Sequence, residues 1–234
     1  MRIYAVADIH GKAKKISKIK QIISRKAPDI LVIAGDITNY FSPLKTFDLL
    51  KDIPIPILGI CGNSDLKPVK GLLQNQENTT LLSHLPFIYK DARFIGLNGT
   101  IPLPFISKIC FNETQRLDVL KPYITQETIL VVHPPPRGVC DKVGNKFRAG
   151  SFCLKKFIEN HPPLMVLCGH IHEQAGYQFL KNTLVVNCAM NKNFSGAIID
   201  SCKNMLLKVK MIVTCVGSGL NSCVIVINNA TMQA

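Results

Sequence analysis

The stretch VLCGHIHE, residues 166–173, ends a short apolar run at Gly169 and then places two histidines two residues apart. In extended backbone, residues i and i+2 project from the same face, so His170 and His172 are expected to point into one shared space. Two converging imidazoles are typical of a metal site, although neutral histidines also occur as satisfied core residues. The pair alone leaves both interpretations open, and the rest of the chain decides between them.

Four other apolar runs have the same design, a segment rich in Val, Ile or Leu that ends at a polar residue. The five runs are IYAVAD (3–8), ILVIAGD (30–36), PILGICGN (56–63), TILVVHP (128–134) and LMVLCGH (164–170). Their length and composition predict buried strands. Metal-capable residues end these runs or follow them closely, namely Asp8, His10, Asp36, Asn63, His133, His170 and His172.

These seven side chains are expected to meet at one crevice, because ligands of open α/β sheets bind outside the carboxyl ends of the strands. Four of the six histidines belong to the set, whereas His84 and His161 do not and are predicted to be ordinary surface or loop residues. Imidazoles, carboxylates and an amide without a thiolate suit Mn, Fe, Zn, Ni or Co better than a structural zinc site. Seven ligands exceed one tetrahedral ion, but they fit two ions about 3.5 to 4 Å apart that clamp a phosphoryl group.

Helical patterns separate several of the runs, at 12–26, 112–121 and 151–160, and Ser151 is a plausible N-cap of the last. From residue 176 onward the strand candidates are too close together for helices, which predicts a second, largely antiparallel sheet. The apolar tail 211–228 is interrupted by GSGLNS, so two strands around a turn are favoured over a membrane span. We therefore expect an α/β protein with a single domain over residues 1–234.

The composition fits a packed globular protein, with 234 residues of which 47% are hydrophobic and 18% charged. A formal net charge of +13 favours anionic partners such as phosphorylated small molecules, nucleic acid or acidic lipid, without choosing among them. The lysine-rich segment 12–20 is either a solvated helix face or a basic rim beside an anion site. Nine cysteines without a CxxC pair, and no signal peptide before Met1, predict a reducing, cytoplasmic location.

Taken together and in order, five motifs resemble those of the calcineurin-like metallophosphoesterase superfamily. They are DIH (8–10), GD (35–36), GNSD (62–65), His133 in VVHPPPRG (131–138) and GHIH (169–172). The resemblance implies a two-sheet β-sandwich of mixed strands flanked by helices. It further implies that phosphate esters are hydrolysed by a hydroxide that bridges two divalent metal ions, with Mn as the first choice and Fe, Zn, Ni, Co or Mg as alternatives.

The same resemblance assigns roles to the seven residues. Asp8, His10 and His172 would bind the first ion, Asn63, His133 and His170 would bind the second, and Asp36 would bridge them.

Ser64 departs from the family pattern, which usually carries histidine after the asparagine. That histidine is thought to contact the scissile phosphate and aid the leaving group, whereas a serine hydroxyl is a poor proton donor at neutral pH. We therefore treat Ser64 as a candidate catalytic residue and expect phosphodiesters rather than phosphomonoesters as substrates. Arg137 and Arg148 are either substrate-binding or ordinary exposed arginines, and Asp65 is expected to buttress its loop.

Two other functions stay open. One is a protein-binding scaffold on the same fold, similar to the retromer subunit, although such scaffolds commonly lose ligands and this chain keeps all seven. The other is a nuclease, which the positive charge favours but which would need an additional capping domain. The expected partner is a phosphate ester and not a membrane. A dimer is plausible through the apolar strands near the C-terminus.

Overall fold

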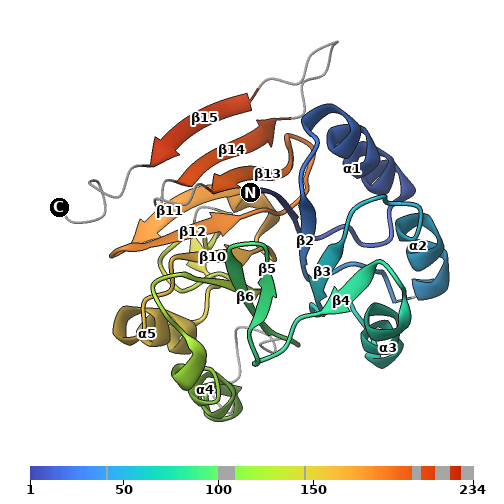
Figure 1. The fold of residues 1–234 in the computed structure, drawn as a ribbon. Coiled ribbons are helices and arrows are strands. Elements are labelled where there is room, and N and C mark those ends of the chain that lie inside the picture. Colours follow the sequence, from blue (N-terminus) through green and yellow to red (C-terminus); the bar gives the residue numbers. More distant parts are fainter. Residues whose placement is uncertain (41, 100–108, 145, 202–206, 214–221, 228–234) are drawn as a thin grey trace.

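The computed structural model describes residues 1–40, 42–99, 109–144, 146–201, 207–213 and 222–227, and two stacked β-sheets form its centre (Figure 1). The first sheet has the strand order β15-β14-β13-β1-β2-β3-β4. Its strands are β1 (Arg2–Val6), β2 (Ile30–Ala34), β3 (Ile57–Ile60), β4 (Thr79–Leu81), β13 (Phe194–Ser201), β14 (Leu207–Val213) and β15 (Ser222–Ile227). Strands β1 to β4 are parallel, and β13 to β15 extend the sheet in antiparallel pairs.

The second sheet has the strand order β11-β12-β10-β7-β6-β5. Its strands are β5 (Phe87–Tyr89), β6 (Ala92–Leu97), β7 (Thr128–Val132), β10 (Met165–Cys168), β11 (Gly176–Leu180) and β12 (Thr183–Asn187). The four inner strands are parallel, and the two edge strands are antiparallel to their neighbours. A short hairpin, β8 (Lys142–Val143) and β9 (Phe147–Arg148), stands apart from both sheets.

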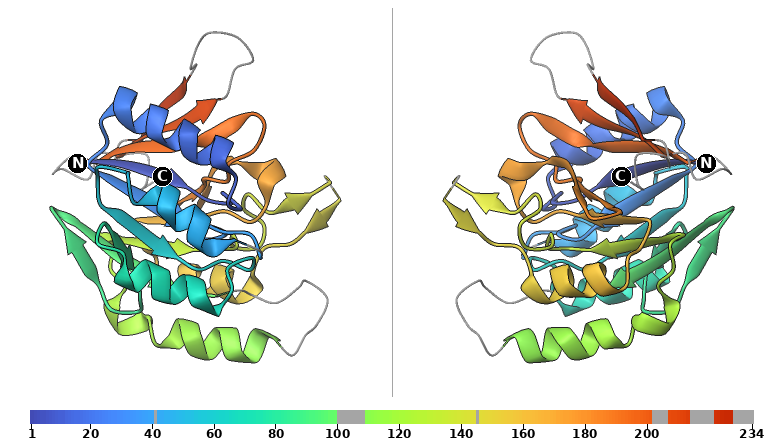
Figure 2. Two further views of the ribbon diagram at one scale, coloured as in Figure 1. Left: turned by 90° about the vertical axis from the view of Figure 1, so that its right-hand side faces the viewer. Right: turned by 90° about the vertical axis from the view of Figure 1, so that its left-hand side faces the viewer.

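Helices cover the outer face of each sheet, which gives four layers (Figures 1 and 2). The first sheet is covered by α1 (Ala13–Lys26), α2 (Pro43–Leu50) and α3 (Lys67–Asn75), and the second by α4 (Ile109–Asp118) and α5 (Phe152–Asn160). Strand β1 shows why the sheet is buried on both faces. Ile3 and Ala5 pack against the second sheet, whereas Tyr4 and Val6 pack under the helices, as the two-residue period of a strand requires.

The five predicted strands are confirmed as β1, β2, β3, β7 and β10, and the mixed two-sheet fold is confirmed with them. Ser151 is the N-cap of α5, as expected. The predicted helix 112–121 corresponds to α4, which begins at Ile109 and ends at Asp118; a separate 3-10 turn follows at Lys121–Tyr123, where Pro122 disfavours a continued helix. In the tail, β14 and β15 pair as predicted, and the turn expected between them lies outside the described residues.

The prediction of a second antiparallel sheet built from the strands after residue 176 is wrong. Strand β12 joins β10 in parallel, with Val166 opposite Val185, whereas β13 joins β1, with Tyr4 opposite Ile198. The physical reason is that β10 and β1 would each leave one row of backbone groups unpaired in the interior. The late strands satisfy these rows in both sheets instead of pairing only with one another.

The described parts of the apolar tail belong to the strands β14 and β15. Among the described residues, no helix has the length and apolar character that crossing a membrane requires.

Ser151 offers a test of the packing between α4 and α5. Its hydroxyl accepts a hydrogen bond from Leu154 N at 2.9 Å and donates one to the buried carboxylate of Glu113 on α4. We expect Ser151→Ala to lower the free energy of unfolding, measured by urea denaturation, by about 1 to 2 kcal/mol. Ser42 is the matched control, since it caps α2 without a side-chain capping bond, and Ser42→Ala should change stability by less than about 0.5 kcal/mol. Equal losses in the two variants would contradict this account.

Candidate metal centre

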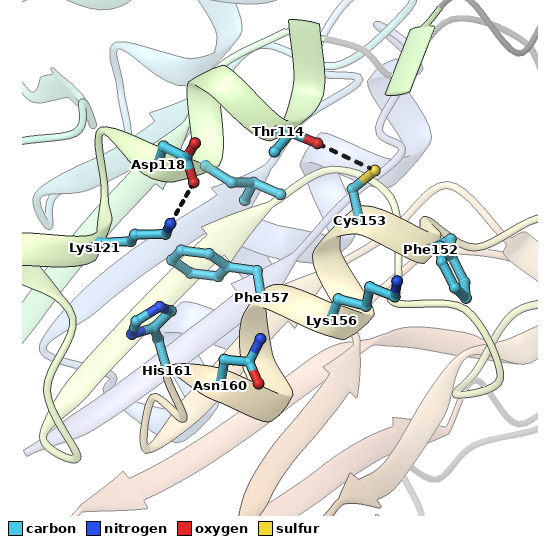
Figure 3. A pocket seen from close by; sticks show the side chains of 10 residues that line it. Thr114, Asp118, Lys121, Phe152, Cys153, Lys156, Phe157, Asn160 and His161 are labelled. Atoms are coloured by element: carbon cyan, nitrogen blue, oxygen red, sulfur yellow. Dashed lines mark hydrogen bonds and ion pairs between the residues drawn. The ribbon is translucent and has the colours of Figure 1, made fainter. Parts of the chain in front are cut away.

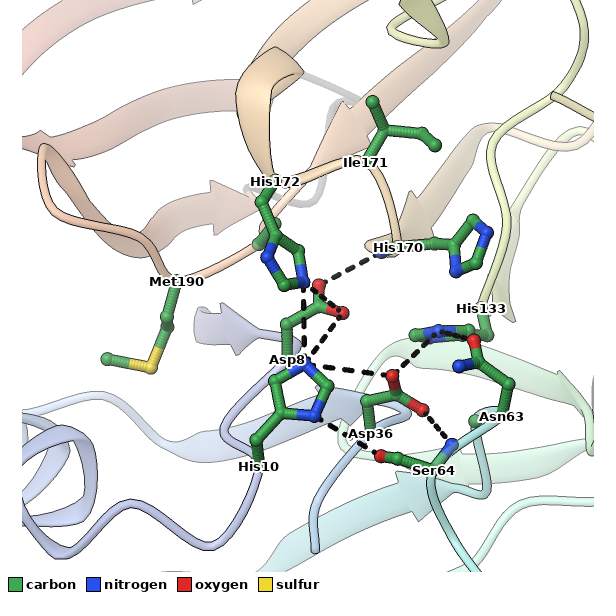
Figure 4. Close-up of polar contacts among 12 residues, drawn as sticks. Asp8, His10, Asp36, Asn63, Ser64, His133, His170, Ile171, His172 and Met190 are labelled. Atoms are coloured by element: carbon green, nitrogen blue, oxygen red, sulfur yellow. Dashed lines mark hydrogen bonds and ion pairs between the residues drawn. The ribbon is translucent and has the colours of Figure 1, made fainter. Parts of the chain in front are cut away.

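The seven predicted residues lie together on loops at the carboxyl ends of strands from both sheets (Figure 4). Within the first sheet, His10 N donates to Asp36 O at 2.9 Å and ties the loop after β1 to the loop after β2. Within the second sheet, Gly169 N donates to His133 O at 2.8 Å and ties the loop after β10 to the loop after β7. His170 N donates to the Asp8 carboxylate at 2.9 Å, so one hydrogen bond connects the two pairs of loops.

Asp8, His10 and His172 form one cluster of converging ligand atoms. The Nε2 atoms of the two imidazoles are 3.4 Å apart, and His172 Nε2 lies 3.1 Å from Asp8 Oδ1. Asp8 is fully buried, and among the described residues its Oδ1 atom accepts no hydrogen bond of suitable geometry, so the ion-pair contact with His172 leaves it incompletely satisfied. A buried carboxylate oxygen of this kind is costly unless a cation satisfies it. The donor set therefore fits a metal ion.

Asp8 also belongs to a second cluster, with Asp36 and His133, and Asn63 lies beside it. His133 Nε2 lies 3.0 Å from Asn63 Oδ1 and 3.5 Å from Asp36 Oδ2. The same Asp36 oxygen is 3.8 Å from His10 Nε2, so this carboxylate lies between the two clusters. The His170 ring completes the group, with its centroid 5.1 Å from that of His133. The structure thus brings all seven residues together, and their assignment to particular metal ions stays a prediction.

Two of the histidines are oriented through their other ring nitrogen. His133 Nδ1 lies 2.9 Å from the carbonyl oxygen of Ala34, which can only accept, so Nδ1 carries the proton of this contact. His10 Nδ1 lies 3.3 Å from Ser64 Oγ. In both residues Nε2 is left facing the carboxylates, which is the arrangement by which outer partners orient metal-binding histidines.

The carboxylates and histidines of the centre shift one another's pKa values. Burial alone would raise the pKa of Asp36, but the adjacent His133 lowers it to about 2. Burial alone would likewise lower the pKa of His133, but Asp36 and then Asp8 raise it to about 9. The pKa of Asp8 is also lowered, because its histidine neighbours outweigh its burial. The two carboxylates are therefore anionic groups that require positive charge close by.

The loop backbone is strained where it presents the ligands. Eight non-glycine residues in the described part of the chain have a positive φ, and four of them belong to the candidate set: Asp8 (59°), His10 (53°), Asp36 (51°) and His170 (70°). This left-handed region is uncommon for residues with a Cβ atom, and such outliers cluster at functional sites. The strain indicates that the loops are shaped for their side chains.

Glycines in the motifs make room for the carboxylates. A Cβ atom at Gly169 would lie 2.6 Å from Asp8 Oδ2, and a Cβ atom at Gly62 would overlap the carboxylate of Asp36. These contacts are shorter than van der Waals separation, so a side chain at either position forces its neighbours to shift; at Gly169 these neighbours are Ala7 Cβ and the Asp8 carboxylate. The glycines before Asn63 and His170 in the sequence thus have a steric explanation.

Ser64 and Asp65 follow Asn63 and are used within the protein. Ser64 is 2% exposed, its backbone N–H donates to Asp36 Oδ1 at 2.8 Å, and its hydroxyl donates to Thr38 O at 2.8 Å. A catalytic role for Ser64 stays a prediction. Asp65 accepts hydrogen bonds from the backbone N–H groups of Ile37, Thr38 and Gly62, which confirms that it buttresses its loop.

Sequence reasoning missed Lys15, a residue of the lysine-rich segment 12–20. Its ammonium group donates to the carbonyl oxygens of Asp8 and Met190, the latter at 2.6 Å, and burial lowers its pKa to about 8. Lys12 and Lys14 are exposed, as the solvated-face interpretation predicts. The signal that distinguishes Lys15 is its position directly beside the buried Ile16, at the border of the apolar face of α1.

Arg148 lies on β9 of the β8–β9 hairpin, which projects from the body of the molecule (Figure 2), and Arg137 lies in the segment before this hairpin. Arg148 pairs with the buried Asp141 at 3.1 Å, and Arg137 donates to Arg148 O at 3.1 Å. The hairpin reaches the ligand loops, because Gly144 N donates to Glu173, the neighbour of His172, at 2.7 Å. Contact of either arginine with substrate stays a prediction.

A separate pocket of about 430 Å³ lies between α4 and α5 (Figure 3). Its lining residues are Thr114, Leu117, Asp118, Lys121, Phe152, Cys153, Lys156, Phe157, Asn160 and His161. None of the seven candidate ligands is among them. His161 lines this pocket and His84 is exposed, and among the described residues neither belongs to a cluster of converging ligand atoms, as predicted.

The calcineurin-like phosphoesterase family model matches residues 1–174, so the chain belongs to this family of phosphoric ester hydrolases. The predicted resemblance is confirmed. The uncharacterized protein MJ1162 of Methanocaldococcus jannaschii is 27% identical over 217 residues, which cover 88% of this chain and 95% of that protein.

Solved structures share the fold. The crystal structure of TT1561 of Thermus thermophilus has a TM-score of 0.66 at 16% identity, covering 85% of this chain and 93% of that chain. A structure described as a novel archaeal phosphodiesterase has a TM-score of 0.50 at 15% identity, covering 97% of this chain and 100% of that chain. At these identities the similarity is one of fold.

Gly169 provides a test of the steric argument. We expect Gly169→Ala to displace the Asp8 carboxylate and to weaken metal binding by at least about tenfold, since even indirect disturbance of a ligand has this effect. Bound metal is measured by elemental analysis after dialysis against defined metal concentrations. Gly71→Ala is the control, because a Cβ atom there meets nothing within 4 Å. Unchanged metal content in Gly169→Ala would contradict the argument.

Proposed function

We propose that the protein is a phosphodiesterase that works with two divalent metal ions, for which manganese is the first choice. The observation that carries the proposal is the convergence of seven donor side chains from five strand ends, including a fully buried carboxylate oxygen that accepts no hydrogen bond of suitable geometry among the described residues. Asp8, His10 and His172 would hold one ion, and Asn63, His133 and His170 the other, with Asp36 shared. Such ions, when bound, supply positive charge to phosphate oxygens and lower the pKa of a coordinated water.

In this proposal, the side chains of the protein orient the reacting groups and provide the negative charge that would hold the ions. Asp8 and Asp36 form the buried, anionic floor of the site, whereas the side chains of His10 and His172 are 25% and 45% exposed. A phosphate ester would therefore approach from the side of these two histidines. The hydrogen bonds of His133 to Ala34 and of Asp65 to its loop keep the floor in place before substrate binds. This preorganisation lowers the cost of aligning the reacting groups.

The preference for diesters rests on the sequence at position 64. A proton donor matters most when the leaving group is poor, and the Ser64 hydroxyl already donates to Thr38 O. By resemblance, family members with small polar residues at this place act on diesters more than on monoesters. The natural ester stays unassigned.

The decisive experiment combines metal analysis with hydrolysis of bis(p-nitrophenyl) phosphate under Mn²⁺ supplementation. The purified protein should contain near-stoichiometric transition metal, and Asp36→Asn should lower kcat by at least about a hundredfold, because it removes the shared carboxylate charge. His161→Ala, which alters a histidine outside the centre, should leave the rate unchanged. Metal-free and inactive protein would favour the scaffold, and DNA binding with a steep salt dependence would favour the nuclease.

The role of position 64 is tested by Ser64→His. If a missing proton donor limits the reaction, the variant should hydrolyse phenyl phosphate about 10² times faster or more, with a smaller gain on p-nitrophenyl phosphate, whose leaving group needs no proton. Steady-state rates on the two esters provide the comparison. Identical rates for Ser64→His and the unaltered protein on phenyl phosphate would mean that Ser64 does not limit the chemistry.

A further inference from the structure

The segment Asn187–Asn191, NCAMN, begins at the last residue of β12 and lies beyond residues 1–174, which the family model matches. It contains none of the seven candidate ligands, yet it contacts the two loops that carry four of them, Asp8 and His10 after β1 and His170 and His172 after β10. We propose that Asn187 and Asn191 are positioning residues that hold His172 toward Asp8 and so determine how tightly one of the two metal ions binds. This inference rests on the proposed two-ion function.

Asn187 is bonded through both ends of its amide. The side chain is fully buried, its Nδ2 donates to Ile171 O at 2.9 Å, and its Oδ1 accepts from Ala189 N at 3.1 Å. The amide therefore joins the ligand loop to its own segment. No apolar side chain of similar size can reproduce this bridge, because it requires a donor and an acceptor.

Asn191 repeats the arrangement one residue further along the ligand loop. Its Nδ2 donates to His172 O, and its Oδ1 accepts from Asn193 N at 2.7 Å and Phe194 N at 2.8 Å. The carbonyl groups of two consecutive loop residues, Ile171 and His172, thus receive their side-chain hydrogen bonds from this one segment. These residues follow the left-handed His170, where no strand pairing fixes the backbone.

The same segment also binds the Asp8 loop. Ala7 N donates to Cys188 O at 3.1 Å, and Met190 N donates to Ala7 O at 3.0 Å. Lys15 adds a second connection, since its ammonium group donates to the carbonyl oxygens of both Asp8 and Met190. Figure 4 shows Met190 on the same side of the site as His172. The segment is therefore hydrogen-bonded to both the Asp8 loop and the His172 loop, and these bonds fix the distance between the two loops.

The effect is expected to be selective. Asn187 and Asn191 contact the loop at Ile171 and His172, whereas His170 is fixed separately by its backbone hydrogen bond to Asp8 and by the bond of Gly169 to His133. Loss of either asparagine amide should free His172 and leave Asn63, His133 and His170 in place. Only the ion held by Asp8, His10 and His172 should then bind more weakly.

The test is calorimetric titration of metal-free protein with Mn²⁺. We compare Asn187→Leu, which keeps the side-chain volume, and Asn191→Ala, which alters a less buried position. The matched control is Asn193→Ala, because Asn193 is exposed and contributes only its backbone N–H. His172→Ala and Asn63→Ala serve as references that identify which binding step belongs to which ion. Thermal unfolding of the metal-free proteins reports separately on the fold.

The expected result is that each of the two asparagine variants weakens the step lost in His172→Ala by about 10- to 100-fold, while the step lost in Asn63→Ala keeps its affinity. Two unchanged steps in Asn191→Ala would overturn the inference. Equal weakening of both steps, together with a lower unfolding temperature of the metal-free protein, would overturn it as well, because that result describes general destabilisation. If the unaltered protein binds no pair of ions, the proposed function fails instead, so the two failures are distinguishable.

Discussion

The structure depends on the burial of two neighbouring carboxylates, Asp8 and Asp36, which are 0% and 2% exposed. Removing a charge from water costs several kcal/mol unless opposite charge and hydrogen bonds replace the solvent. In this protein the replacement comes from His10, His133 and His172 and from backbone N–H groups of other loops. The motif glycines and the left-handed backbone of the loops allow the histidines and the backbone N–H groups to approach the two carboxylates.

The centre belongs to both sheets rather than to one. The carboxylates follow β1 and β2 in the first sheet, whereas His133 and His170 follow β7 and β10 in the second. Their geometry is therefore set by the packing of the two sheets, through a core in which Ala5, Val32 and Val131 are fully buried. Because close-packed interiors transmit small shifts, a cavity in this core would move one half of the centre relative to the other.

The sequence predicts what is local and misses what is not. A run such as ILVIAGD predicts both a buried strand and the polar residue at its end, so the sequence predicts the strand ends and the candidate ligands that follow them. Strand β12 pairs with β11, its neighbour in sequence, and also with β10, and no local pattern in the sequence predicts this second pairing. The roles of Lys15 and Asn187 were not predicted for the same reason, because their hydrogen-bond partners are carbonyl groups of loops distant in the sequence. Helices α2 and α3 were not predicted from the sequence; both are short, and Pro43 and Pro68 lie in their first turns.

The serine at position 64 fits into this network as a small, inward-facing group. Its hydroxyl hydrogen is used on Thr38 O, which leaves the oxygen able to accept the proton on His10 Nδ1. That contact keeps His10 Nε2 directed at Asp8 and Asp36, where a metal ligand is needed. Under the proposed function, a serine held in this way would supply no proton, so the acidity of the departing alcohol would be the main determinant of the hydrolysis rate.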